Sequence, residues 1–308
     1  MMESMSRTRL AAALTLPALA LTVLTACGND SDPTPASSTA TESTEEPTQT
    51  DEPSEPSEPS EPTSEAPATV AAPVYFVGET PQGPRLFREF REVAADDTAV
   101  EALELVTSGD ALDPDYSTLY PGGGSFVSVD VAADLITVGL PDESWTVAPD
   151  GMSQREARLA TQQMVYTVQG IAQKRLPVAI TLDGAPADLF GLAGEVSNDP
   201  ELDVRALVNV TTPGEGGTVS GTFTAEGVSS SFEATTPWEI RKGGADGEVV
   251  KEGFVTAEGW IDKLYPWQAE VDVSDLEPGS YTFVAMTDDP SGGEGGGPTV
   301  DTKSITVG

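Results

Sequence analysis

Two pairs of aspartates are the residues of this chain whose type and spacing could do acid–base chemistry. Asp113 and Asp115 stand just before Tyr116, and Asp288 and Asp289 are adjacent. A carboxylate pair is what glycoside hydrolysis requires, with one group as the acid and the other as nucleophile or base. Both pairs lie in turn-rich stretches where aspartate is favoured for local hydrogen bonding, and we favour that structural interpretation. Such loops also suit calcium, but their spacing does not match an EF-hand, and we predict no metal site.

Other sets of reactive side chains are missing from the sequence. The chain has no histidine and one cysteine, so it contains no Ser-His-Asp or Cys-His nucleophile and no zinc motif built on either residue. Its glycine runs at 214–217 and 292–297 do not open a helix after a strand, so we interpret them as turns and not as phosphate loops. The sequence therefore predicts no cofactor and no enzymatic activity.

The single cysteine, Cys27, ends the segment Leu24-Thr25-Ala26-Cys27, and an uncharged run at 10–23 precedes that segment. With Arg7 and Arg9 upstream, this is the layout of a secretory signal, and about 14 apolar residues are too few to span a bilayer. The ending resembles a bacterial lipobox, which implies that residues 1–27 are a lipoprotein signal peptide and that Cys27 is lipidated. The resemblance places the mature chain on the extracytoplasmic face of the cell membrane. The alternative is a leftover or buried thiol at an ordinary signal-peptide junction.

Residues 28–70 have the composition of a disordered tether. They contain 11 acidic residues, no aromatic residue and no lysine or arginine, and they repeat Ser-Glu-Pro three times from Ser54 to Pro62. Such a segment cannot bury enough apolar surface to offset the entropy of ordering. In an extended state it reaches at most on the order of 130 Å, which is enough to hold a domain away from the lipid.

The remainder of the chain is strongly acidic, with 39 acidic and 13 basic residues. This balance argues against binding to nucleic acid or docking on anionic lipid, because both need clustered lysine or arginine. One cysteine also excludes a disulfide framework, so packed cores must stabilise the fold.

Residues 71–195 alternate between strand and helix patterns. Strands are expected at 74–77 and 85–93, and a helix capped by Asp97 is expected to end at Gly109. A hairpin then precedes Ser153-Gln154-Arg155-Glu156, which is a capping box at the start of a helix to about residue 172, and residues 177–182 form a final strand. We expect an α+β fold in which both helices cover one face of a single mixed sheet.

Residues 200–308 lose the helical periodicity and become rich in valine, threonine, glycine and aromatic residues. Eight short strands are expected, at 204–210, 218–225, 231–234, 238–241, 248–256, 267–273, 279–287 and 304–307. Their spacing is typical of an all-β immunoglobulin-like sandwich without its disulfide. Trp260, Tyr265 and Trp267 are a possible binding patch, although we favour the alternative that such tryptophans fill the core.

Both folded segments resemble known families. The strand Val74–Val77, the loop Tyr120-Pro121-Gly122-Gly123-Gly124 and the helix with Gln162-Gln163 resemble the GerMN domain of sporulation and germination lipoproteins. The phrases Thr218-Val219-Ser220-Gly221 and Ser231-Phe232-Glu233-Ala234 resemble the immunoglobulin-like domain of bacterial spore germination proteins. These resemblances imply assembly or binding modules, and no catalytic residue can be carried over from them.

We therefore expect a non-enzymatic cell-envelope lipoprotein that binds or scaffolds extracytoplasmic partners, either a protein complex or peptidoglycan, with sporulation or germination as a secondary possibility. One alternative is a wall-glycan hydrolase that uses paired carboxylates. Another is a substrate-binding lipoprotein that feeds a transporter, but neither segment resembles the paired α/β lobes of that class.

Overall fold

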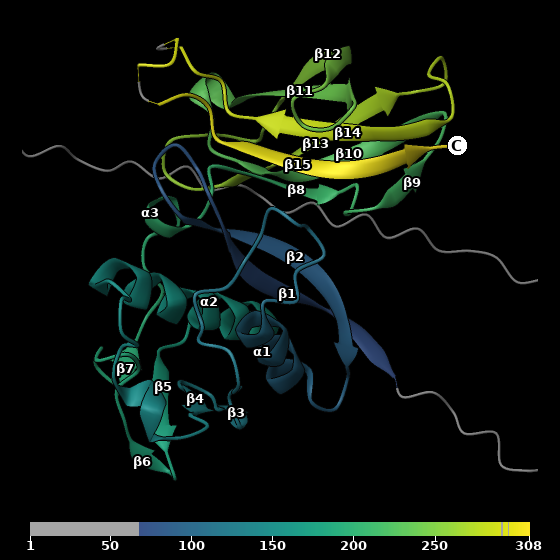
Figure 1. The fold of residues 1–308 in the computed structure, drawn as a ribbon. Coiled ribbons are helices and arrows are strands. Elements are labelled where there is room, and N and C mark those ends of the chain that lie inside the picture. Colours follow the sequence, from purple (N-terminus) through teal and green to yellow (C-terminus); the bar gives the residue numbers. More distant parts are fainter. Residues whose placement is uncertain (1–67, 291, 295) are drawn as a thin grey trace, which may run out of the picture. The chain divides into compact units, whose positions relative to one another are not determined.

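The computed structural model describes residues 68–308 except residues 291 and 295 (Figure 1). Cys27, the signal segment and nearly all of the expected tether lie outside the described residues. Within the described part, no helix has both the length and the apolar character needed to cross a membrane.

The first two strands form a long antiparallel hairpin. Strand β1 (Thr69–Gly78) pairs with β2 (Arg85–Ala94) over ten residues each, and Phe76 stands opposite Phe87. The hairpin confirms the two expected strands and extends both of them. It forms a two-stranded sheet of its own, so the expectation of one mixed sheet for the whole segment is wrong.

Helix α1 (Thr98–Ser108) ends where the sequence predicts. Gly109 adopts a left-handed conformation with φ of 70°, and its amide donates to the carbonyls of Leu105 and Val106. The N-terminus differs from the expectation, because the side chain of Asp97 makes no capping hydrogen bond. Glu101 in the first turn ties the helix to the preceding strand, because its Oε2 accepts the amide of Ala94 at the end of β2 at 2.7 Å.

Helix α2 (Gln154–Ala172) is the longest helix of the described residues, and it begins with the predicted capping box. The hydroxyl of Ser153 accepts the amide of Glu156 at 3.2 Å, while the Glu156 carboxylate accepts the amide of Ser153 at 2.7 Å. The helix ends at Gln173, which is left-handed with φ of 53°. Almost every side chain from Ala157 to Gln169 is buried, because the helix is covered on more than one side.

The second sheet of this segment is small and mixed. Strand β3 (Ser128–Val131) pairs antiparallel with β4 (Ile136–Gly139), and β4 pairs parallel with β5 (Val178–Leu182). Figure 1 shows α1 and α2 between this sheet and the β1–β2 hairpin, and one core joins Phe76, Met164 and Ile180 from the three layers. The remaining short elements are η1 (Glu143–Thr146), β6 (Ala185–Pro186) and β7 (Glu195–Val196).

The second segment starts with a one-turn helix, α3 (Glu201–Val204), and continues as a sandwich of two sheets. One sheet has the strand order β13-β10-β8 and the other has the order β12-β11-β14-β15-β9. Their strands are β8 (Val208–Thr212), β9 (Gly217–Val219), β10 (Thr222–Ser229), β11 (Thr235–Lys242), β12 (Glu248–Thr256), β13 (Tyr265–Asp272), β14 (Gly279–Met286) and β15 (Val300–Val307). The expected α+β segment followed by an immunoglobulin-like sandwich is confirmed.

Two of the expected strands in this segment are wrong in part. Residues 231–234 form a 3₁₀ turn, η2 (Phe232–Ala234), in which Glu233 and Ala234 both have positive φ angles. Residues 204–207 precede β8 and include the end of α3. Both errors fall on segments of four residues that mix polar and apolar side chains, which are too short for periodicity to distinguish a strand from a turn of helix.

Candidate functional site

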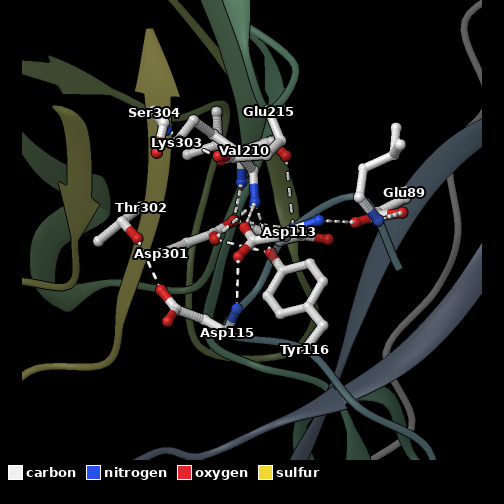
Figure 2. Close-up of polar contacts among 12 residues, drawn as sticks. Glu89, Asp113, Asp115, Tyr116, Val210, Glu215, Asp301, Thr302, Lys303 and Ser304 are labelled. Carbon is white, nitrogen blue, oxygen red and sulfur yellow. Dashed lines mark hydrogen bonds and ion pairs between the residues drawn. The ribbon is translucent and has the colours of Figure 1, made fainter. Parts of the chain in front are cut away.

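A buried cluster of charged side chains joins the two folded segments (Figure 2). Asp301 and Lys303 come from β15 of the sandwich, while Asp113 and Tyr116 come from the loop that follows α1. Asp113, Asp301 and Lys303 are each 4% exposed or less, so the cluster is closed to solvent. We call these four residues the interlock.

Lys303 is the centre of the interlock. Its Nζ lies 2.5 Å from Oδ2 of Asp113, 2.7 Å from the hydroxyl oxygen of Tyr116 and 3.0 Å from Oδ1 of Asp301. The Tyr116 hydroxyl donates to Oδ1 of Asp301 at 2.7 Å. The ammonium also lies 4.4 Å from the centre of the Tyr116 ring. All three donors of the ammonium thus have an acceptor from the protein.

Further hydrogen bonds hold the carboxylate of Asp301 and the backbone of Asp113. Oδ2 of Asp301 accepts the amide of Val210 at 2.6 Å and Nδ2 of Asn209 at 2.9 Å. On the other side, the buried carboxylate of Glu89 accepts the amide of Asp113 at 2.8 Å. These bonds fix the positions of both aspartates, because each is held from its own segment and from the opposite one.

The electrostatics of the interlock follow from burial and from an excess of negative charge. Burial raises the pKa of Asp113 to about 6, although the ammonium of Lys303 opposes the shift. Burial would lower the pKa of Lys303, but Asp301 and Asp113 outweigh it and hold that pKa above its ordinary value. Burial and then the neighbouring carboxylate of Asp301 raise the pKa of the Tyr116 phenol well above its usual range. At neutral pH, Lys303 is therefore charged and Tyr116 is neutral.

The strand pattern explains why a lysine and an aspartate point inward on β15. The side chains of Asp301, Lys303, Ile305 and Val307 alternate with exposed or half-buried neighbours, so all four share one face of the strand. The two apolar residues pack into the core of the sandwich, and the same face meets the first segment through the two charged residues. Asp301 and Lys303 occupy the positions of the strand that alternate in step with the buried Ile305 and Val307. This pattern is the signal in the sequence that could have identified the site.

The arrangement is poorly suited to acid–base catalysis. Lys303 is protonated and cannot serve as a base, and Tyr116 holds its proton. The ionisable groups satisfy one another and are closed to solvent, so they offer a substrate neither a free acceptor nor access. No cluster of three or more potential metal ligands occurs among the described residues.

The structure separates the two aspartate pairs by role. Asp113 is buried in the interlock, whereas Asp115 is exposed, donates its amide to Asp113 at 2.9 Å and accepts the hydroxyl of Thr302 at 3.0 Å. Asp288 is exposed and donates its amide to Ser231, and the carboxylate of Asp289 accepts the amide of Gly293 at 2.7 Å. The bonds from Asp115 to Asp113 and from Gly293 to Asp289 are the local hydrogen bonds favoured from the sequence. The bonds to Lys303, Thr302 and Ser231 join residues far apart in the chain and were not expected.

The structure divides the three aromatic residues of the predicted patch. Trp267 is 4% exposed and lies in the sandwich core, so its place in a binding patch is wrong and the core interpretation holds for it. Trp260 and Tyr265 are half-buried at the surface. Trp260 meets the exposed ring of Phe232 edge to face, with 5.3 Å between ring centres. Sequence reasoning missed Phe232 because it comes from a different turn.

The comparisons with known proteins identify the second segment. Residues 207–294 match the family model described as the immunoglobulin-like domain of bacterial spore germination, as the sequence resemblance predicted. No curated protein matches the chain. Solved structures that resemble the chain include the following two.

One of these structures contains the tandem GerMN domains of the sporulation protein GerM from Bacillus subtilis. It has a TM-score of 0.33 and 14% identity, and the match covers 47% of this chain and 49% of that one. The other is a protein from Clostridium perfringens that is described as a lipoprotein, with a TM-score of 0.28 and 16% identity, covering 44% of this chain and 93% of that one. By the family match, residues 207–294 form an immunoglobulin-like domain of the bacterial spore germination family.

Proposed function

We propose that this chain is a non-enzymatic lipoprotein of the cell envelope, anchored through Cys27 on the outer face of the membrane, that binds or scaffolds extracytoplasmic partners. The observation that carries the proposal is the interlock. In the interlock, Asp113 and Tyr116 from the loop after α1 bond Lys303 and Asp301 of the sandwich. Those groups therefore join two modules and are not held ready for a substrate.

The family match supports the same interpretation. The matched domain at residues 207–294 is described by its occurrence in bacterial spore germination, and the interlock residues Asp301 and Lys303 lie just beyond it on the last strand. A part in germination or sporulation is the secondary element of the proposal. The partners that we propose are envelope proteins or peptidoglycan, together with the membrane itself through the lipid on Cys27.

Affinity capture with the mature chain, beginning at Cys27, tests the binding role against envelope extracts and isolated peptidoglycan. We expect specific retention of an envelope protein or of glycan, and no release of soluble sugar fragments from the glycan. Sugar release that disappears in Asp113→Asn and Asp115→Asn variants that keep the wild-type circular dichroism would instead establish the hydrolase.

The anchor has a separate test. Wild-type chain expressed in a bacterium that processes lipoproteins should partition with membranes and incorporate labelled palmitate, and Cys27→Ala should do neither. Soluble wild-type chain that retains its N-terminus would refute the anchor without affecting the binding role.

A further inference from the structure

Basic residues are scarce in this chain, and four of the 13 that follow the tether line one groove. The groove has a volume of about 510 Å³ and lies where β1, β2 and the C-terminal end of α2 meet α3 and the loop before β13. Its cations are Arg88, Lys174, Arg175 and Arg205, and Glu201 is the one carboxylate that lines it. The local charge is therefore positive in a chain whose net charge is −36.

Arg205 supplies buried charge on the wall of the groove. It is 4% exposed, its guanidinium lies 5.3 Å from the centre of the Tyr75 ring, and it forms an ion pair with Glu201. Its Nε and Nη2 have no hydrogen-bond partner in the described structure. Buried N–H groups of this kind normally find an acceptor, so unpaired ones call for a water or a ligand. Glu201 contacts Arg205 through Oε1 alone, and its other oxygen accepts the amide of Leu264 at 3.3 Å, so neither oxygen of Glu201 bonds Nε or Nη2.

The other two arginines are held by aromatic rings and by neutral acceptors in place of acids. Nη2 of Arg88 donates to the hydroxyl of Thr211 at 3.2 Å, and Nη1 of Arg175 donates to Oε1 of Gln169 at 3.1 Å. The guanidinium of Arg88 lies 4.7 Å from the centre of the Phe90 ring, and that of Arg175 lies 4.8 Å from the centre of the Tyr166 ring. Neither of them, nor Lys174, forms an ion pair with a carboxylate of the described residues. Burial lowers the pKa of Arg88, and the nearby charge of Arg205 acts in the same direction. Arginines fixed in this way are preorganised to bind carboxylates with paired hydrogen bonds.

The rest of the lining favours a peptide over a phosphate polymer. Pro73, Val228 and Leu264 give the groove apolar surface, and the exposed Gln173 adds a side-chain amide. The amide of Gln169 is already bonded within the protein, to Arg175 and to the carbonyl of Leu176. Apolar contacts and amide hydrogen bonds suit the backbone and side chains of a peptide, whereas a bare polyphosphate would use only the charges.

We propose that this groove binds an acidic peptide segment, whose carboxylates pair with Arg88, Lys174 and Arg175 above the buried charge of Arg205. The inference rests on the proposed function and gives it a partner class, namely an envelope protein with an exposed glutamate- or aspartate-rich segment. The chain's own negative charge repels such a segment at long range, so recognition depends on the short-range contacts of the groove.

Calorimetric titration of the full chain with acetylated hexaglutamate tests the proposal. Hexaglutamine serves as the neutral control and tripolyphosphate as the phosphate control. We expect hexaglutamate to bind, to weaken as salt is raised and to bind more tightly than either control. Equal binding of the two peptides, absence of hexaglutamate binding, or tighter binding of tripolyphosphate would overturn it.

Variants locate the binding on the protein. Lys174 and Arg175 are exposed, so the double variant Lys174→Ala/Arg175→Ala should fold normally, and it should weaken hexaglutamate binding about tenfold or more. Lys242→Ala removes an exposed lysine of β11 that does not line the groove, and it should change the affinity less than about twofold. Equal losses in the two variants would show non-specific attraction and refute the site. If the chain binds hexaglutamate but captures no envelope partner, the proposed function is refuted and the peptide site in the groove is not.

Discussion

Replacing Lys303 with methionine is the sharpest test of the interlock. The substitution keeps most of the side-chain length but removes the charge that lies 2.5 Å from Asp113 and 3.0 Å from Asp301. Two carboxylates that are each 2% exposed then remain without their cation. Breaking a buried ion pair in this way costs about 3–5 kcal/mol, which is a large share of the roughly 5–15 kcal/mol that stabilises an ordinary domain.

Urea unfolding followed by circular dichroism measures this cost. Thr302→Ala is the matched control on the neighbouring residue of β15, because Thr302 bonds the exposed carboxylate of Asp115 and should contribute less than about 1 kcal/mol. A triple variant, Lys303→Met with Asp113→Asn and Asp301→Asn, removes the stranded charges and should recover much of the loss. If Lys303→Met costs no more than Thr302→Ala, the cluster is hydrated and does not join the two segments.

Three further predictions concern single groups. The pKa of Asp113 is raised from 3.8 to about 6, so between these pH values the folded chain holds a proton that the unfolded chain releases. The contribution of this group to the free energy of unfolding should therefore fall as pH rises from about 4 to about 6. Asp113→Asn should flatten that part of the stability profile in urea unfolding, and an unchanged profile would contradict the assignment. Trp267→Ala should lower the free energy of unfolding in urea by about 3–5 kcal/mol, because it empties a core position. Trp260→Ala, at a half-buried surface position, should cost clearly less. Equal costs would contradict the assignment of Trp267 to the core. Ser153→Ala should cost about 1 kcal/mol in thermal unfolding by removing the capping box of α2, and no change would show that the box contributes nothing to stability.

Features set by neighbours along the chain could be predicted from the sequence. The capping box needs only residues three apart, and the end of α1 needs only a glycine that tolerates a positive φ. The alternation of β1, β2 and most sandwich strands follows from the side-chain period of two. The separation of the hairpin from the β3–β6 sheet could not be predicted, because it depends on which faces α1 and α2 cover.

The interlock and the groove depend on residues that are far apart in the sequence. Asp113 and Lys303 are 190 positions apart, and no local pattern pairs them. The inward position of Lys303 could have been predicted from Ile305 and Val307, but its partner could not. Arg88 and Arg175 likewise reach the same groove from a strand and from the loop after a helix.

Asn209 connects the interlock to the groove. Its Oδ1 accepts the backbone amide of Arg88 at 2.8 Å, and its Nδ2 donates to Oδ2 of Asp301 at 2.9 Å. Nη2 of Arg88 also donates to Thr211 at 3.2 Å, so β8 holds this groove arginine by its backbone and by its side chain. The groove wall on β2 is thus positioned by a strand that also binds the buried Asp301. Because a binding site loses affinity when its charges move by even small distances, a change at Asp301 that displaces Asn209 should also weaken hexaglutamate binding at the proposed site through Arg88.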